Sequence, residues 1–158
     1  MGAALQVSDS LIDELVAADC VVLGTPIYNF GMPAQLKAYF DQVVRVGRTF
    51  AFAPGDAEPY RPLLASKPVI VVTAAGDGSM HPGGALYHLN YLEPHLLTVL
   101  GFIGLTDTTF VRVGYDEFQD DRLKRSLSAA ERTIDELATA MSRKFAENST
   151  AERITSRN

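Results

Sequence analysis

The sequence predicts an α/β fold in a single domain, built on a parallel sheet. Continuous apolar, β-branched runs at residues 20–25 and 69–76 indicate strands that are covered on both faces. A third apolar stretch at residues 108–114 follows, and amphipathic segments lie between the runs. Alternating strands and helices predict a parallel sheet with right-handed crossovers. The length of 158 residues fits one domain; we place it at residues 1–147, with a polar tail at residues 148–158.

Composition and charge exclude several classes of partner. Nineteen acidic residues against fourteen basic ones give a formal net charge of −5, so we expect no nucleic-acid partner, which would need a basic face. No apolar span is long enough to cross a bilayer, and we expect no membrane partner. The single cysteine, Cys20, cannot form an internal disulfide, and its apolar surroundings predict a small buried side chain. These features, with no recognisable signal peptide, predict a cytoplasmic protein.

The first half of the chain reads as helix, strand and helix. Ser8, Asp9 and Ser10 predict the start of the first helix, because such residues cap helix N-termini. The strand at residues 20–25 follows. Pro33 suits the first turn of the second helix. Its apolar residues recur at helical spacing and predict one buried face, made of Leu36, Phe40, Val43 and Val44.

The second half begins with residues 53–68, whose four prolines predict a surface loop. After the strand at residues 69–76 we expect a helix over residues 85–101, in which Pro94 either kinks the helix or opens a new one. The strand at residues 108–114 alternates more, which favours a place near the sheet edge. The last helix should run over residues 120–147 with one apolar face, made of Leu123, Leu127, Ala130, Ile134, Leu137, Met141 and Phe145.

Two unusual loops follow the first two strands. The first, at residues 25–32, holds Tyr28, Asn29 and Phe30, with Gly31 leaving room for a flat ligand to approach the backbone. Both rings could instead pack under the loop as part of the core. In open parallel sheets ligands bind outside the carboxyl ends of the strands, so both loops should lie on one rim.

The second loop, at residues 74–84, is rich in glycine and also contains Asp77, Ser79 and His81. Its backbone amides could bind the polar atoms of a planar ring, although a flexible surface turn is equally compatible with the composition. The loop matches neither the GxxxxGK[ST] phosphate loop nor GxGxxG. Two such loops on one rim predict a shared site for a planar ligand.

At this point the sequence resembles a known family. The segment LGTPIYNFGMPAQLKAYFDQVVRVGRTFAF is similar to the FMN-dependent NADH azoreductase and NAD(P)H quinone reductase family, of flavodoxin-like fold. That family carries a P-x-Y-N-F loop, a Q-L-K helix and an R-x-G-x-T-F segment, and LGFIGLTD at residues 100–107 resembles its LGFIGITD segment. The matched residues are Pro26, Tyr28, Asn29, Phe30, Gln35, Leu36, Lys37, Arg45, Gly47, Thr49 and Phe50. The resemblance covers roughly residues 8–138.

The resemblance implies a three-layer α/β/α sandwich with FMN as cofactor. It implies that the first loop holds the isoalloxazine ring and that the second binds the ring's polar edge. The implied cofactor-binding residues are Pro26, Ile27, Tyr28, Asn29, Phe30, Thr73, Ala74, Ala75, Gly76, Asp77 and Gly78. No metal is implied.

The second loop departs from the family's usual double glycine and looks more like that of mammalian-type quinone reductases. Those enzymes place a tyrosine and a histidine six residues apart to move a proton during hydride transfer. Here His81 and Tyr87 have this separation in reversed order. They are therefore candidates for a catalytic proton relay, and an exposed loop histidine is the alternative.

The implied activity is ping-pong hydride transfer from NADH or NADPH, through the flavin N5, to a quinone or azo compound. The site of the family lies at a homodimer interface, so a homodimer is implied here. A flavin-free interaction module or inactive remnant is the alternative. An electron-transfer flavodoxin fits less well, because such proteins carry a strongly acidic face.

The resemblance also implies a missing part. Family members begin with a strand, a serine-rich loop that grips the FMN phosphate, a helix and a second strand, and no such pattern precedes Ser8. We therefore expect the C-terminal part of the fold, with strands 3, 4 and 5 of the order 2-1-3-4-5. Residues 20–25 should then form an exposed edge strand, and this chain alone should bind FMN poorly.

Overall fold

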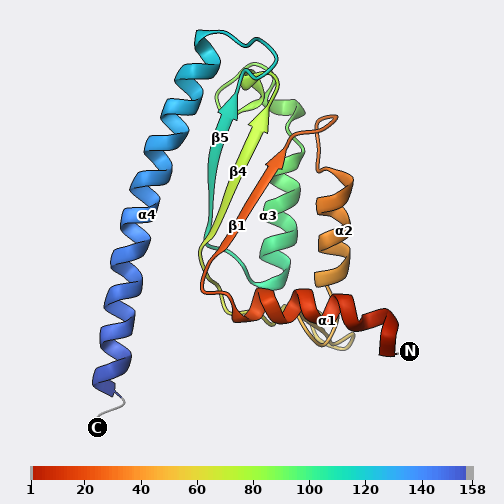
Figure 1. Cartoon of the computed structure of the whole chain (residues 1–158). Coiled ribbons are helices and arrows are strands. Elements are labelled where there is room, and N and C mark those ends of the chain that lie inside the picture. The colour runs from red at the N-terminus through yellow and green to blue at the C-terminus, as the bar shows by residue number, and fades with distance from the viewer. Residues whose placement is uncertain (1, 156–158) are drawn as a thin grey trace.

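The structure is a computed structural model that describes the backbone of residues 2–155 and the side chains of residues 5–147. Helices and strands alternate along the chain as expected (Figure 1). The helices and strands are α1 (Gly2–Ala17), β1 (Val21–Pro26), α2 (Ala34–Val43), β2 (Phe50–Phe52), β3 (Tyr60–Pro62), β4 (Val69–Ala75), α3 (Leu92–Ile103), β5 (Thr108–Gly114) and α4 (Asp121–Thr155). Two single 3₁₀ turns, η1 (Gly78–Met80) and η2 (Tyr87–Leu89), lie between β4 and α3.

A three-stranded parallel sheet forms the centre of the molecule, in the order β1-β4-β5. Val21 lies opposite Val69, which in turn lies opposite Thr108, so the strands start at the same level. Their carboxyl ends consequently meet at one rim of the sheet, near the top of Figure 1. The expected contiguous parallel sheet is confirmed, and β5 lies at an edge as its alternating pattern indicated.

Helices cover the sheet from two sides, which gives the expected α/β/α layering (Figure 1). Alternate residues of a strand face opposite sides of a sheet. Val69 and Val71 are buried in the main core with Leu96 and Leu100 of α3. On the opposite face, Ile70 borders a small cavity that α4 also lines.

The strand β1 forms the other edge of the sheet, as expected. Val22 is 66% exposed and lies on the sheet face opposite the main core, whereas Leu23 packs against that core. An exposed apolar edge strand can pair with other chains. Cys20, just before β1, is only partly buried, so the expectation of a small buried side chain holds in part. Burial raises the pKa of its thiol, and Asp107 raises it further.

Helix boundaries differ from the sequence-based expectation at two places. The first helix begins at Gly2, so Ser8, Asp9 and Ser10 lie inside α1 instead of capping it. The expected helix at residues 85–101 is a 3₁₀ turn, η2, followed by α3. Pro94 lies in the first turn of α3, where its missing N–H leaves no hydrogen bond unmade. The second of the two alternatives for Pro94 is therefore the correct one.

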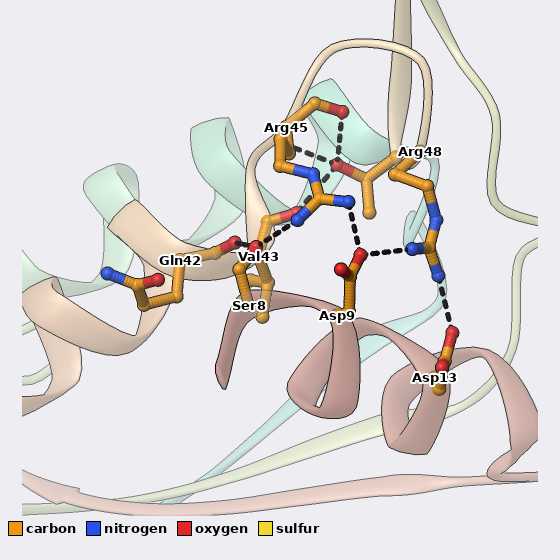
Figure 2. Close-up of polar contacts among 8 residues, drawn as sticks. Ser8, Asp9, Asp13, Gln42, Val43, Arg45 and Arg48 are labelled. Atoms are coloured by element: carbon orange, nitrogen blue, oxygen red, sulfur yellow. Dashed lines mark hydrogen bonds and ion pairs between the residues drawn. The ribbon is translucent and has the colours of Figure 1, made fainter. Parts of the chain in front are cut away.

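Two of the three residues mistaken for caps, Ser8 and Asp9, hold α1 against the turn after α2 (Figure 2). Arg45 donates to Ser8 Oγ at 2.8 Å and to Asp9, and Arg48 donates to Asp9 and Asp13. Ser8 Oγ donates to the carbonyl of Gln42 at 2.6 Å. We call this set of contacts the α1 clamp. It explains part of the R-x-G-x-T-F segment as a structural motif.

The rest of that segment forms the turn itself. Thr49 is fully buried, and its Oγ1 donates to the Val43 carbonyl at 2.7 Å and accepts from the Arg45 N–H at 2.9 Å. Gly47 has a φ of 75°, in the left-handed region that favours glycine. The turn then leads directly into β2.

The proline-rich segment is not simply a surface loop, because β2 and β3 form a short antiparallel hairpin across it. The rings of Phe52 and Tyr60 stack with centroids 5.1 Å apart, and Phe102 of α3 lies 5.7 Å from Tyr60. These three side chains and the half-buried Phe50, 4.9 Å from Phe102, form what we call the hairpin cluster. Phe52 and Tyr60 are about half exposed, so the cluster is an apolar feature of the surface.

The last helix, α4, packs along β5 and continues to Thr155. Its expected apolar face is confirmed at Ala130, which is buried, but Leu127 and Ile134 are 42% and 41% exposed. The backbone of residues 148–155, which we placed in a polar tail, continues α4, and residues 156–158 lie outside the described residues. No helix within the described residues has the length and apolar character needed to span a bilayer.

Candidate functional site

A pocket of about 220 Å³ opens at the rim where the carboxyl ends of the strands meet. Three loops build it, one after each strand of the sheet. Its lining consists of Ile27, Asn29 and Phe30 from the first loop, Gly76, Asp77 and Met80 from the second, and Glu117 from the third. The two loops singled out from the sequence therefore do share one site.

The first loop contains a tight turn whose central residues are both in the left-handed region. The N–H of Tyr28 donates to Gly31 O at 3.1 Å, and the N–H of Gly31 donates to Tyr28 O at 2.9 Å. Between them, Asn29 has a φ of 47° and Phe30 a φ of 71°. Asparagine tolerates this region, but a bulky residue such as phenylalanine is strained there. Strain of this kind is concentrated at functional sites.

The two rings of this loop are exposed, so they are not part of the core. Tyr28 is 62% exposed and Phe30 46%. Only Phe30 of the two lines the pocket. A Cβ at Gly31 would meet no atom within 4 Å, so no neighbouring protein group requires glycine at that position.

Backbone hydrogen bonds fix the turn on both sides. The N–H of Ile27 donates to Ala74 O at 2.8 Å, and the N–H of Tyr91 donates to Phe30 O at 2.8 Å. Within the described part of the chain, the N–H groups of Asn29 and Phe30 form no hydrogen bond. A rigid loop with free donors at a pocket can bind the acceptor atoms of a ring.

The second loop contributes a fixed carboxylate. Asp77 Oδ1 accepts from the Ser79 N–H at 2.8 Å. Hydrogen bonds from Ser79, first that of its backbone N–H, lower the pKa of Asp77 and keep it ionised. The pocket therefore carries a stable negative charge next to Gly76.

The other expected cofactor-binding residues lie around the pocket without lining it. Thr73 and Ala75 are buried within β4, and Thr73 Oγ1 has no hydrogen-bond partner. Ala74 is exposed, and its carbonyl accepts a hydrogen bond from the Ile27 N–H of the first loop. Pro26 ends β1 opposite Ala74. Gly78 packs so closely on Tyr115 that a Cβ there would lie 2.5 Å from the ring.

A buried polar network supports the second loop from beneath. The carboxylate of Glu93, at the start of α3, accepts from Arg112 Nε at 2.9 Å and from Arg112 Nη2 at 2.7 Å. Glu93 also accepts from Asn90 Nδ2 at 3.2 Å, and the same amide donates to the carbonyl of Met80 at 3.2 Å. The network thus links β5 and α3 to Met80, which lines the pocket.

The two candidate relay residues lie near this network. His81 is half-buried with its Nε2 buried and unpartnered, so it is not an exposed loop histidine. Burial lowers its pKa; Glu93 opposes that shift and Arg112 adds to it. Tyr87 is 41% exposed; the pKa of Arg112 is raised first by its hydrogen bond to Glu93 and only last by Tyr87. Neither residue lines the pocket, and their part in proton transfer stays a prediction.

Met80 and Glu117 line the pocket but were not among the expected site residues; Met80 at least lies in the second loop, whereas Glu117 lies outside both loops. The N–H of Glu117 donates to Gly76 O at 3.2 Å, and its side chain lies directly over Gly76. A Cβ at position 76 would be 2.6 Å from the carboxyl carbon of Glu117, so a larger residue there would displace this exposed side chain. No motif pointed to it, because nothing in the sequence pairs the loop after β5 with Gly76. Among the described residues, no group of three or more potential ligand side chains forms a metal site.

Comparison with known proteins settles the family. The model of the family described as "Flavodoxin-like fold" matches residues 1–138. The chain belongs to this flavodoxin-like family. It is 62% identical over 133 residues to the "FMN-dependent NADH:quinone oxidoreductase" of Opitutus terrae, which covers 84% of this chain and 62% of that protein. It is 43% identical over 135 residues to a protein of Colwellia psychrerythraea named "FMN-dependent NADH:quinone oxidoreductase 2", covering 84% and 61%. The flavodoxin-like chain therefore spans a little over three fifths of the length of these relatives.

Solved structures agree with the flavodoxin-like fold. An azoreductase from Bacillus anthracis str. Sterne is 25% identical, with a TM-score of 0.73 over 85% of this chain and 62% of that one. An FMN-dependent NADH-azoreductase from Bacillus anthracis str. Ames Ancestor, solved with FMN, has a TM-score of 0.76 over 87% and 63%. At 21% identity the second structure supports the fold alone.

Proposed function

We propose that the pocket binds the isoalloxazine ring of FMN and that the chain serves in the reduction of quinones or azo compounds by NADH or NADPH. The observation that carries this proposal is the strained turn at Asn29 and Phe30, two residues that line the pocket and whose N–H groups have no partner among the described residues. The names of the similar proteins support the same activity.

The residues present fit a flat, partly polar ring. Ile27, Phe30 and Met80 offer apolar contact, and the N–H groups of Asn29 and Phe30 can donate to ring acceptors. When bound, FMN would supply the hydride chemistry, and the chain would bind the ring, orient it and exclude water. NADH or NADPH and the quinone or azo compound would use the same open face of the flavin ring in turn. We therefore expect ping-pong kinetics.

Flavin binding is tested most directly by fluorescence. The purified chain is titrated with FMN and with lumiflavin, which has the same ring and no phosphate. We expect the chain to quench the fluorescence of both flavins. Phe30→Ala should bind them roughly tenfold more weakly, because it loses the contact of one aromatic ring with the flavin. Phe118→Ala is a matched control, since Phe118 is also exposed and does not line the pocket. Equal affinities in the wild type and Phe30→Ala would contradict the assignment of the pocket.

A flavin-free interaction module is the second candidate function. The exposed hairpin cluster and the apolar edge strand β1 favour it, because both are suited to contacts with protein. A colourless preparation that quenches the fluorescence of neither FMN nor lumiflavin would support this candidate and exclude the first. A homodimer is part of the first proposal, and the hairpin cluster supports it as a surface that two copies could share.

A further inference from the structure

The pocket contains two carboxylates and no basic side chain among its lining residues. Asp77 is held ionised by Ser79, as described above. Glu117 forms no ion pair or side-chain hydrogen bond with any residue that the structure describes. The nearby guanidinium of Arg122 is engaged by Asp120, at 2.7 Å, and lies over the ring of Phe118. After the hydrogen bonds from Ser79, Arg122 also helps to lower the pKa of Asp77 from outside the pocket, but no residue that lines the pocket neutralises its charge.

The position of Glu117 is built into the fold. Its N–H is tied to Gly76 O, and its exposed side chain lies over Gly76, which has no side chain of its own to displace it. A pocket of about 220 Å³ is too small for a ring ligand to stay clear of one wall. Asp77 and Glu117 both line it, so a ring seated there has two acidic residues in the wall of its site.

We propose that Asp77 and Glu117 make the pocket charge-selective, so that it favours neutral or cationic ring ligands over anionic ones. The reason is Coulomb repulsion between the carboxylates and a negatively charged ring, which solvent weakens because Glu117 is exposed. This inference rests on the proposed flavin site and deepens it. It predicts that the pocket binds an oxidised, neutral flavin ring more tightly than the same ring in its reduced, anionic form.

Glu117→Gln tests this selectivity, because glutamine keeps the shape of the side chain and removes its charge. Lumiflavin is titrated into the chain in its oxidised form, and anaerobically in its form reduced by dithionite at mildly alkaline pH. We expect Glu117→Gln to strengthen binding of the reduced ring by roughly two- to fivefold, the range for a solvent-exposed charge contact, and to leave the oxidised ring nearly unchanged. The difference should shrink at high salt.

Asp116→Asn is the matched control, since it removes the same charge from the neighbouring residue, which does not line the pocket. It should leave both affinities unchanged. If the wild type binds lumiflavin and Glu117→Gln does not change the ratio of the two affinities, the charge selectivity is wrong and the flavin site stands. If neither the wild type nor the variant binds lumiflavin, the flavin site and the selectivity both fail.

Discussion

At the scale of single residues, the most informative feature is the backbone of Phe30. A phenylalanine with a φ of 71° is destabilising on its own account. The turn keeps it, although its ring is half exposed and contributes little to the core. A residue that costs stability and presents its ring to a pocket is best explained by binding.

Two substitutions separate the strain at Phe30 from the function of its ring. Phe30→Gly removes the ring and the strain, whereas Phe30→Ala removes the ring and keeps the strain. We expect the glycine variant to be more stable than the alanine variant by about 1 kcal/mol, although both lose flavin affinity. Urea denaturation and lumiflavin titration measure the two effects. An alanine variant as stable as the glycine variant would show that the turn is not strained.

His81 makes a second prediction, on the pH dependence of stability. Burial lowers its pKa from the ordinary value of 6.5, so the unfolded chain binds this proton more readily than the folded one. The stability that neutral His81 contributes is therefore fully present at pH values above its ordinary pKa of 6.5, and it is lost as the pH falls through the folded-state pKa. His81→Gln should flatten the acid side of the stability profile, measured by urea denaturation at a series of pH values.

The control for His81 is His88→Gln, which replaces an exposed histidine of the same loop region. Its profile should follow that of the wild type. A His81→Gln profile with an unchanged acid slope would mean that the titration of His81 does not affect folding.

At the scale of secondary-structure elements, the hydrophobic pattern of the sequence predicted the central strands and the loops that follow them. The apolar runs gave β1 and β4 to within about one residue, although one face of β1 is exposed, and the two loops were correctly placed on one rim. The hairpin of β2 and β3 was missed because strands of three residues are too short for a period and lie among prolines. Ser8 and Asp9 were mistaken for caps because their role depends on Arg45, which is distant in sequence. Glu117 was missed because its place at the pocket depends on Gly76, which is also distant in sequence.

The α1 clamp gives a prediction for one element. Asp9 accepts from both Arg45 and Arg48, whereas Asp13 contacts Arg48 alone and is 69% exposed. Asp9→Asn should therefore lower the free energy of unfolding by about 1 kcal/mol, and Asp13→Asn by less than about 0.5 kcal/mol. Urea denaturation at low and high salt measures both. Equal effects of the two substitutions would show that the clamp is only a surface contact.

At the scale of the whole molecule, two exposed apolar surfaces predict different kinds of self-association. The hairpin cluster is a compact patch of stacked rings, which suits a closed dimer in which two copies share one patch. The strand β1 has one edge without a partner strand among the described residues, and an open edge suits strand pairing that can continue without limit. The two surfaces can therefore be separated by substitution.

The joint substitution Phe52→Ser and Tyr60→Ser should convert a dimer to a monomer in sedimentation velocity, because it removes the stacked rings of the cluster. Val22→Lys should leave the dimer intact and reduce the slow growth of large particles in light scattering, since a charge on an edge strand opposes pairing. Val16→Lys adds the same charge on α1, at a residue that is 53% exposed, and should change neither measurement. A dimer that survives the double substitution and dissociates with Val22→Lys would instead place the interface at the edge of the sheet.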